Sequence, residues 1–184
     1  MNRIETLAKK FEDHISLQWQ QNLSSPEKTI FVVYPKEDEL RLRAKKDLFR
    51  QACLKAAHPW QEVDLDDSFP EWMASQDYAA DYYEFPDDLK QKLETEFTTH
   101  VADAIRARLD SMGDDEALGV FGVGTLFGFT HFSSVLKQLE GCVRGRLIVF
   151  FPGSHEKNVY RLLDARDGWG YMAYPITLTE VAYL

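Results

Sequence analysis

Apolar residues recur every three or four positions in several stretches of the chain, a spacing that predicts amphipathic helices. The stretches are residues 2–23, 38–57 and 86–112, and a shorter one from Phe132 to Leu139. The segment Ser68-Phe-Pro-Glu71 has the spacing of a capping box, so it predicts one more short helix that ends near Gln76. Between these stretches the pattern changes, which places other elements there.

Continuous apolar runs separate the helices and predict strands that are buried on both faces. They are Thr29–Tyr34, Ala117–Val123 and Arg146–Phe151. The segments Tyr160–Leu163 and Tyr171–Ile176 alternate like a hairpin, with Asp167-Gly168 at the turn. Strands that alternate with helices predict an α/β fold, here a three-layer sandwich with a mostly parallel central sheet and a C-terminal antiparallel hairpin. No linker or repeat interrupts the pattern, so residues 1–184 are expected to form a single α/β domain.

The charge is unevenly distributed along the 184 residues, whose net charge is −9. Residues 61–116 carry 4 basic and 17 acidic side chains. Because neutralised phosphates supply most of the affinity for nucleic acids, an acidic chain is not expected to bind DNA or RNA directly. The N-terminal run lacks an apolar signal core, no stretch is long enough to span a bilayer, and Cys53 and Cys142 have no CxxC spacing. We therefore expect a cytoplasmic protein with no membrane contact and no disulfide.

Candidate catalytic and metal-binding motifs are absent from the sequence. No two histidines are spaced i, i+4, and no Gly-x-Ser-x-Gly surrounds Ser154. We expect no catalytic residue, no metal ligand and no cofactor, and hence not an enzyme. The alternative is a degenerate nucleotide-binding enzyme that uses the Gly122–Gly128 loop, although this loop lacks the Gly-Lys-Ser/Thr ending and has no Lys or Arg before Thr130.

Two clusters remain as candidate binding surfaces. Aromatic residues interleave with acids in the least regular part of the chain, and these are Trp72, Tyr78, Tyr82, Tyr83 and Phe85. One alternative is that they are core residues of an irregular segment. The other is that they form an interface, because Tyr and Trp are enriched in the hot spots of protein–protein interfaces. A second cluster follows the third predicted strand and consists of Arg161, Asp164, Arg166, Asp167 and Trp169. Its opposite charges either pair with each other and fix the turn, or form an exposed recognition edge.

Several strings resemble the BrxB family, a small component of the BREX bacteriophage-defence systems. They are Phe150-Phe-Pro-Gly153, Tyr160-Arg-Leu-Leu-Asp-Ala-Arg-Asp-Gly-Trp169, Tyr171 through Pro175-Ile176, Gly122-Val-Gly-Thr-Leu-Phe127, Ser133-Ser-Val-Leu136 and Phe31-Val-Val-Tyr-Pro35. The resemblance is dense over residues 117–176 and thin over the middle third. It implies no catalytic residues. It also implies partners among the other BREX proteins, above all a PglZ-like protein, so that the chain is expected to be a non-enzymatic adaptor.

Overall fold

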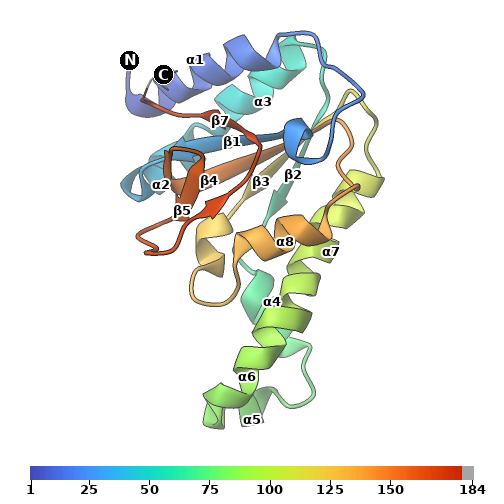
Figure 1. The fold of residues 1–184 in the computed structure, drawn as a ribbon, viewed down its shortest axis with the longest axis vertical. Helices are drawn as coiled ribbons and strands as arrows, with labels where there is room; N and C mark the ends of the chain where they lie inside the picture. The colour runs from blue at the N-terminus through green and yellow to red at the C-terminus, as the bar shows by residue number, and fades with distance from the viewer. Residues whose placement is uncertain (180–184) are drawn as a thin grey trace.

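A mixed sheet of seven strands forms the centre of the structure, a computed structural model that describes residues 1–179 (Figure 1). The strands are β1 (Thr29–Tyr34), β2 (Trp60–Asp64), β3 (Ala117–Phe121), β4 (Arg146–Glu156), β5 (Val159–Leu162), β6 (Trp169–Gly170) and β7 (Tyr174–Ile176). Five of them follow the order β2-β3-β4-β1-β7 and are parallel to their neighbours. The second half of β4 pairs antiparallel with β5, which in turn pairs with β6.

The α/β class predicted from the sequence is confirmed, but the finer prediction is not. The sheet is mixed, so a mostly parallel sheet within a three-layer sandwich is not confirmed as stated. The predicted hairpin is wrong in its partners, because Tyr174–Ile176 pairs in parallel with β1 rather than with β5. The strand that pairs with β5 on that side is Trp169–Gly170, and the tight turn lies at Lys157-Asn158 between β4 and β5.

Helices cover both faces of the sheet (Figure 1). They are α1 (Arg3–Ile15), α2 (Glu39–Ala44), α3 (Lys46–Lys55), α4 (Ser68–Ala74), α5 (Ala79–Glu84), α6 (Pro86–Lys92), α7 (Thr98–Asp110) and α8 (Phe132–Gln138). Single helical turns add η1 (Pro26–Lys28), η2 (Lys36–Asp38), the π-helical η3 (Leu93–Phe97) and η4 (Val123–Leu126). Among the described residues, no helix combines the length and the apolar character that crossing a bilayer requires.

Alternate side chains of the central strands enter two separate cores. On one face, Val32 and Phe150 pack with α1 and α3. On the other, Phe31 and Phe151 pack with α4, α7 and α8. Because successive side chains of a strand point to opposite faces, a largely apolar run with no charged position needs apolar cover on both sides. This explains why β1 is buried along its whole length.

Several elements differ from the sequence prediction at their ends or in kind. The first helix ends at Ile15, and residues 16–23, which were predicted to continue it, are not helical. The second predicted helix divides at Lys45 into α2 and α3. Residues 60–64, where the apolar pattern predicts neither a helix nor a strand, form β2.

A helical arm extends from the sheet to the bottom of Figure 1. Its axis is the predicted helix of residues 86–112, seen as the successive elements α6, η3 and α7. The π turn in its middle places the Thr98 hydroxyl 2.9 Å from the carbonyl oxygen of Leu93, to which it donates. Helices α4 and α5 accompany this axis, and α5 and α6 form the end farthest from the sheet, here called the arm tip (residues 77–88). The arm therefore carries the most acidic part of the chain away from the sheet.

Candidate functional site

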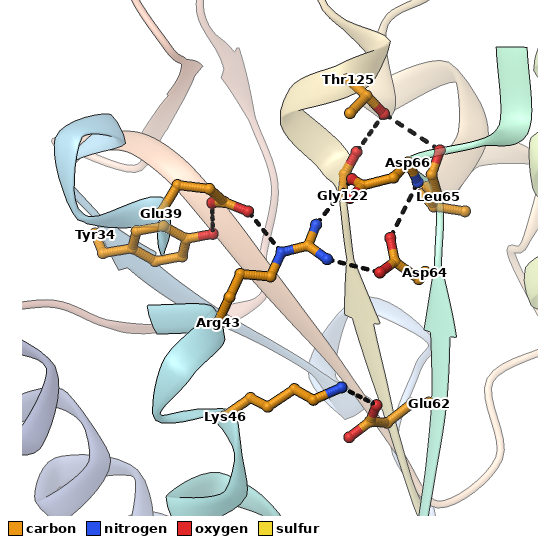
Figure 2. A network of polar contacts seen from close by, with 10 residues as sticks. All are labelled: Tyr34, Glu39, Arg43, Lys46, Glu62, Asp64, Leu65, Asp66, Gly122 and Thr125. Atoms are coloured by element: carbon orange, nitrogen blue, oxygen red, sulfur yellow. Dashed lines mark hydrogen bonds and ion pairs between the residues drawn. The ribbon is translucent and has the colours of Figure 1, made fainter. Parts of the chain in front are cut away.

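A polar network lies where the parallel strands β2 and β3 end (Figure 2). Arg43 of α2 is its centre. Its Nε donates to Glu39 at 3.0 Å, and its two terminal nitrogens donate to Asp64 at 2.6 Å and Asp66 at 2.8 Å. The carboxyl ends of parallel strands are the usual place for ligands in α/β folds, so this network is the first position to test for chemistry.

The groups of this network already satisfy one another. The Tyr34 hydroxyl donates to Glu39, and burial together with that carboxylate raises the pKa of Tyr34. Gly122 has a φ of +83°, and a Cβ there would lie 2.6 Å from an Asp66 oxygen, so the loop after β3 packs closely against the acids. Within residues 1–179, no three metal-ligating side chains are arranged to hold an ion. The network joins α2 to the ends of β2 and β3.

We expect Asp66→Asn to raise the free energy of unfolding at pH 7. Burial, with a smaller contribution from Asp64, raises the pKa of Asp66 although Arg43 opposes the shift. A raised folded-state pKa stabilises the protein below the ordinary carboxyl pKa, and this contribution is lost as pH rises through the folded-state value. Urea unfolding at pH 7 and at about pH 3, below the ordinary carboxyl pKa, checks this. The gain should disappear in acid, and Asp114→Asn, which replaces an exposed acid, should show no gain at either pH.

The five predicted aromatic residues separate into core and surface positions. Trp72 is only 3% exposed and belongs to the core of the arm-side face. Tyr82 is half-buried against the same core. The other three are surface residues of the arm tip: Tyr78 is 67% exposed, Tyr83 72% and Phe85 57%. Both alternatives left open by the sequence are thus present, at different residues.

The arm tip is acidic as well as aromatic. Asp77, Asp81, Glu84 and Asp88 make no ion pair with any described residue, whereas Asp87 pairs with Lys90 at 2.9 Å. Three large exposed rings among unpaired carboxylates are unusual for a surface that contacts only water, because large exposed apolar side chains concentrate at binding sites. Of the predicted aromatic residues, Tyr78, Tyr83 and Phe85 are the ones that the fold leaves exposed.

The second predicted cluster does not form as expected. Its acids pair with residues outside the cluster: Asp164 forms an ion pair with Lys36, and Asp167 lies 4.0 Å from the His131 ring. The alternative in which the cluster's charges form ion pairs with each other is therefore wrong, and its four charged side chains are exposed. Arg161 donates to the carbonyl oxygen of Arg166 at 3.3 Å, which holds the loop after β5.

Trp169 packs against core residues rather than beside the charged residues of this cluster. Its ring lies 5.5 Å from that of Tyr160 and 5.8 Å from that of Phe31, measured between ring centroids. Half-buried rings in such edge-to-face and tilted contacts stabilise the fold by their packing. The cluster is thus divided between a structural aromatic residue and an exposed charged loop.

Comparison with known protein families shows to which family the chain belongs. The family model of BREX protein BrxB matches residues 64–175, more than half of the chain. The chain belongs to the BrxB family. This confirms the resemblance found in the sequence and makes the protein a component of a BREX phage-defence system. No curated protein and no solved structure gave a significant match.

The BrxB match contains the whole arm and most of the sheet's second half. It begins at Asp64, within the Arg43 network, and ends at Pro175 in β7. The sequence analysis missed this network, since neither Arg43 nor Asp64 belongs to a predicted cluster or motif. The available signal was the position of the acids after a strand, but that strand, β2, was itself not predicted.

Proposed function

We propose that this BrxB-family chain is a non-enzymatic adaptor that binds a protein partner through its arm tip. The observation that supports this most is the exposure of Tyr78, Tyr83 and Phe85 at the end of the arm. Truncation of an aromatic hot-spot residue at the centre of an interface costs about 2 kcal/mol or more. An arm also lets the tip enter a concave surface while the sheet stays outside.

Charge indicates what kind of partner fits. Basic side chains of the first 60 residues are largely occupied by internal ion pairs, such as Arg3 with Asp38, Lys45 with Glu5 and Lys55 with Glu12. The first 60 residues of a second copy therefore offer few unpaired cations to the tip's carboxylates. A different protein with a basic surface complements them, and such complementarity speeds association.

A PglZ-like BREX protein is the partner that we propose. Proteins that act beside DNA carry basic surfaces, because phosphates must be neutralised. The resemblance implies a shared system for the two proteins.

The test is co-purification of the tagged chain with the other BREX proteins of its system. We expect capture of the PglZ-like protein at low salt and progressively less capture as salt rises from about 0.05 to 0.5 M, since the Debye length shortens over this range. Capture that is insensitive to salt would contradict the electrostatic part of the proposal. Failure to capture the PglZ-like protein at any salt concentration would contradict the choice of partner.

We also expect that the purified chain does not bind ATP or GTP. The Gly122–Gly128 loop forms the turn η4, in which the N–H groups of Thr125 and Phe127 donate to Gly122 and Gly124. The Thr125 hydroxyl lies 2.6 Å from the Gly122 carbonyl oxygen, and the Asp66 carboxylate lies against the same glycine. A phosphate at this loop would find these backbone N–H groups already hydrogen-bonded and would be repelled by the Asp66 carboxylate. Isothermal calorimetry that measured a micromolar Kd for either nucleotide would favour the enzyme alternative.

A further inference from the structure

An open cleft of about 710 Å³ lies beside the arm, between the end of α4, the π turn η3 and the start of α7. Ser75 and Gln76 form part of one wall and lead directly into the arm tip. Its charged lining consists of Glu94, Glu96 and Asp103, with no lysine or arginine. π turns within helices occur often at functional sites, which makes this wall a position to examine.

A nearly buried tryptophan lines this cleft. Trp72 is 3% exposed, and it is part of the cleft lining. None of the hydrogen bonds among residues 1–179 uses its indole N–H. Among the described residues, this nitrogen is not one of the fully buried side-chain atoms that lack a hydrogen-bond partner, so it keeps some contact with solvent. The indole N–H therefore has no hydrogen-bond acceptor among the described residues, and its side chain lines the cleft.

The acidic side of the cleft is available to a cation. Glu94 has no ion pair with a described residue. Glu96 is paired with Lys92 at 2.6 Å, and Asp103 is paired with Arg106, but these are exposed pairs between neighbouring turns of a helix. Pairs of that kind are worth only about 0.3–0.5 kcal/mol, so a guanidinium brought by a partner replaces them at little cost.

We propose that this cleft binds a basic peptide segment of the partner, a proposal that rests on the adaptor function above. A backbone carbonyl of the segment accepts a hydrogen bond from the Trp72 indole, and an arginine or lysine side chain pairs with Glu94. The combination of one free donor with several carboxylates matches a peptide, which offers an acceptor and a cation within a few atoms. It disfavours nucleic acids and free phosphate, whose charge the carboxylates repel. The aromatic tip and the cleft then form one continuous surface along the arm.

The probe is the fluorescently labelled peptide acetyl-(Gly-Arg)4-amide, titrated with the full chain and followed by anisotropy. We expect Trp72→Phe to weaken binding about fivefold, the effect of one hydrogen bond, while phenylalanine preserves the aromatic packing. Glu94→Gln should weaken binding about threefold. The matched control is Asp114→Asn, which removes one exposed negative charge from the turn before β3 and should leave binding unchanged.

Two results would overturn the proposal. One is an equal loss for Asp114→Asn and Glu94→Gln, which would mean attraction to the overall negative charge. The other is unchanged binding by Trp72→Phe with an unchanged melting temperature, which would mean that the indole makes no contact.

Co-purification with the PglZ-like protein separates this proposal from the adaptor function. Loss of the complex in tip variants but not in the Trp72 and Glu94 variants would refute the cleft and leave the adaptor function standing. If the unchanged chain captures no PglZ-like protein while peptide binding stays sensitive to Trp72 and Glu94, the adaptor function with that partner is refuted and the cleft stands as a peptide-binding site.

Discussion

Replacement of Tyr83 and Phe85 by alanine is expected to abolish co-purification with the PglZ-like partner while the melting temperature stays the same. Both rings are more than half exposed at the arm tip, so their removal takes little packing from the folded chain. Two interface aromatics at about 2 kcal/mol each correspond to a loss of about a thousandfold in affinity. The measurement is paired: capture of the partner, and thermal unfolding of the purified variant. Tyr82 is left unchanged because it packs against the core.

The matched control for this double variant removes two exposed apolar side chains elsewhere. Leu40 on α2 is 83% exposed and Met172 before β7 is 77% exposed. Leu40→Ala with Met172→Ala should retain the complex, because these residues lie outside the arm. If the control loses the complex equally, general surface hydrophobicity rather than the tip holds the partner. A tip variant that binds as well as the unchanged chain would exclude the tip from the interface.

Gly153→Ala is expected to lower the free energy of unfolding by about 3 kcal/mol, at the upper end of overpacking effects. At this position β4 continues from its parallel neighbours into the antiparallel pair with β5, and Gly153 faces Leu162. A Cβ at Gly153 would overlap the carbonyl oxygen of Arg161. Backbone cannot move aside as a flexible side chain does, so we expect the two strands to separate locally. Thermal unfolding should show a decrease of about 6–12 °C in Tm.

Gly128→Ala provides the comparison. Gly128 has a φ of +83°, but a Cβ there would meet nothing within 4 Å. Only the left-handed backbone is then unfavourable, which costs about 1–2 kcal/mol. Gly128→Ala should therefore destabilise the chain less than Gly153→Ala. The opposite order would show that the close approach of β4 and β5 relaxes easily.

The sequence predicted correctly those elements whose pattern of apolar and polar residues fits only one kind of secondary structure. The strand Thr29–Tyr34 is correct at both ends, because six buried positions in a row bounded by prolines fit only a strand covered on both faces. Strand β2 was missed because Trp60–Asp64 is half polar, as suits a strand at the edge of the sheet. Alternation in Tyr174–Ile176 correctly indicated a strand but gave no information on its partner, and the partner is β1.

The candidate site was predictable in position but not in detail. Acidic and aromatic composition identified the segment from Trp72 to Phe85, yet only the fold separates buried Trp72 from exposed Tyr83. The short helix α5 places Tyr82 against the core and Tyr83 toward solvent, a difference that adjacent residues of one type cannot reveal in sequence. The cleft next to Trp72 depends on the π turn η3, which has no distinct sequence signal.

The position of β1 has a consequence for how the family's segment folds. This strand lies between β4 and β7, although it precedes the segment that the BrxB model matches. A fragment that began at Asp64 would lack a central strand, and the apolar faces of Phe121 and Phe150 would lose the helices α1 and α3 that cover them. The matched residues are thus not an autonomous folding unit in this chain. Dissection into fragments should yield insoluble pieces rather than a working arm on a smaller scaffold.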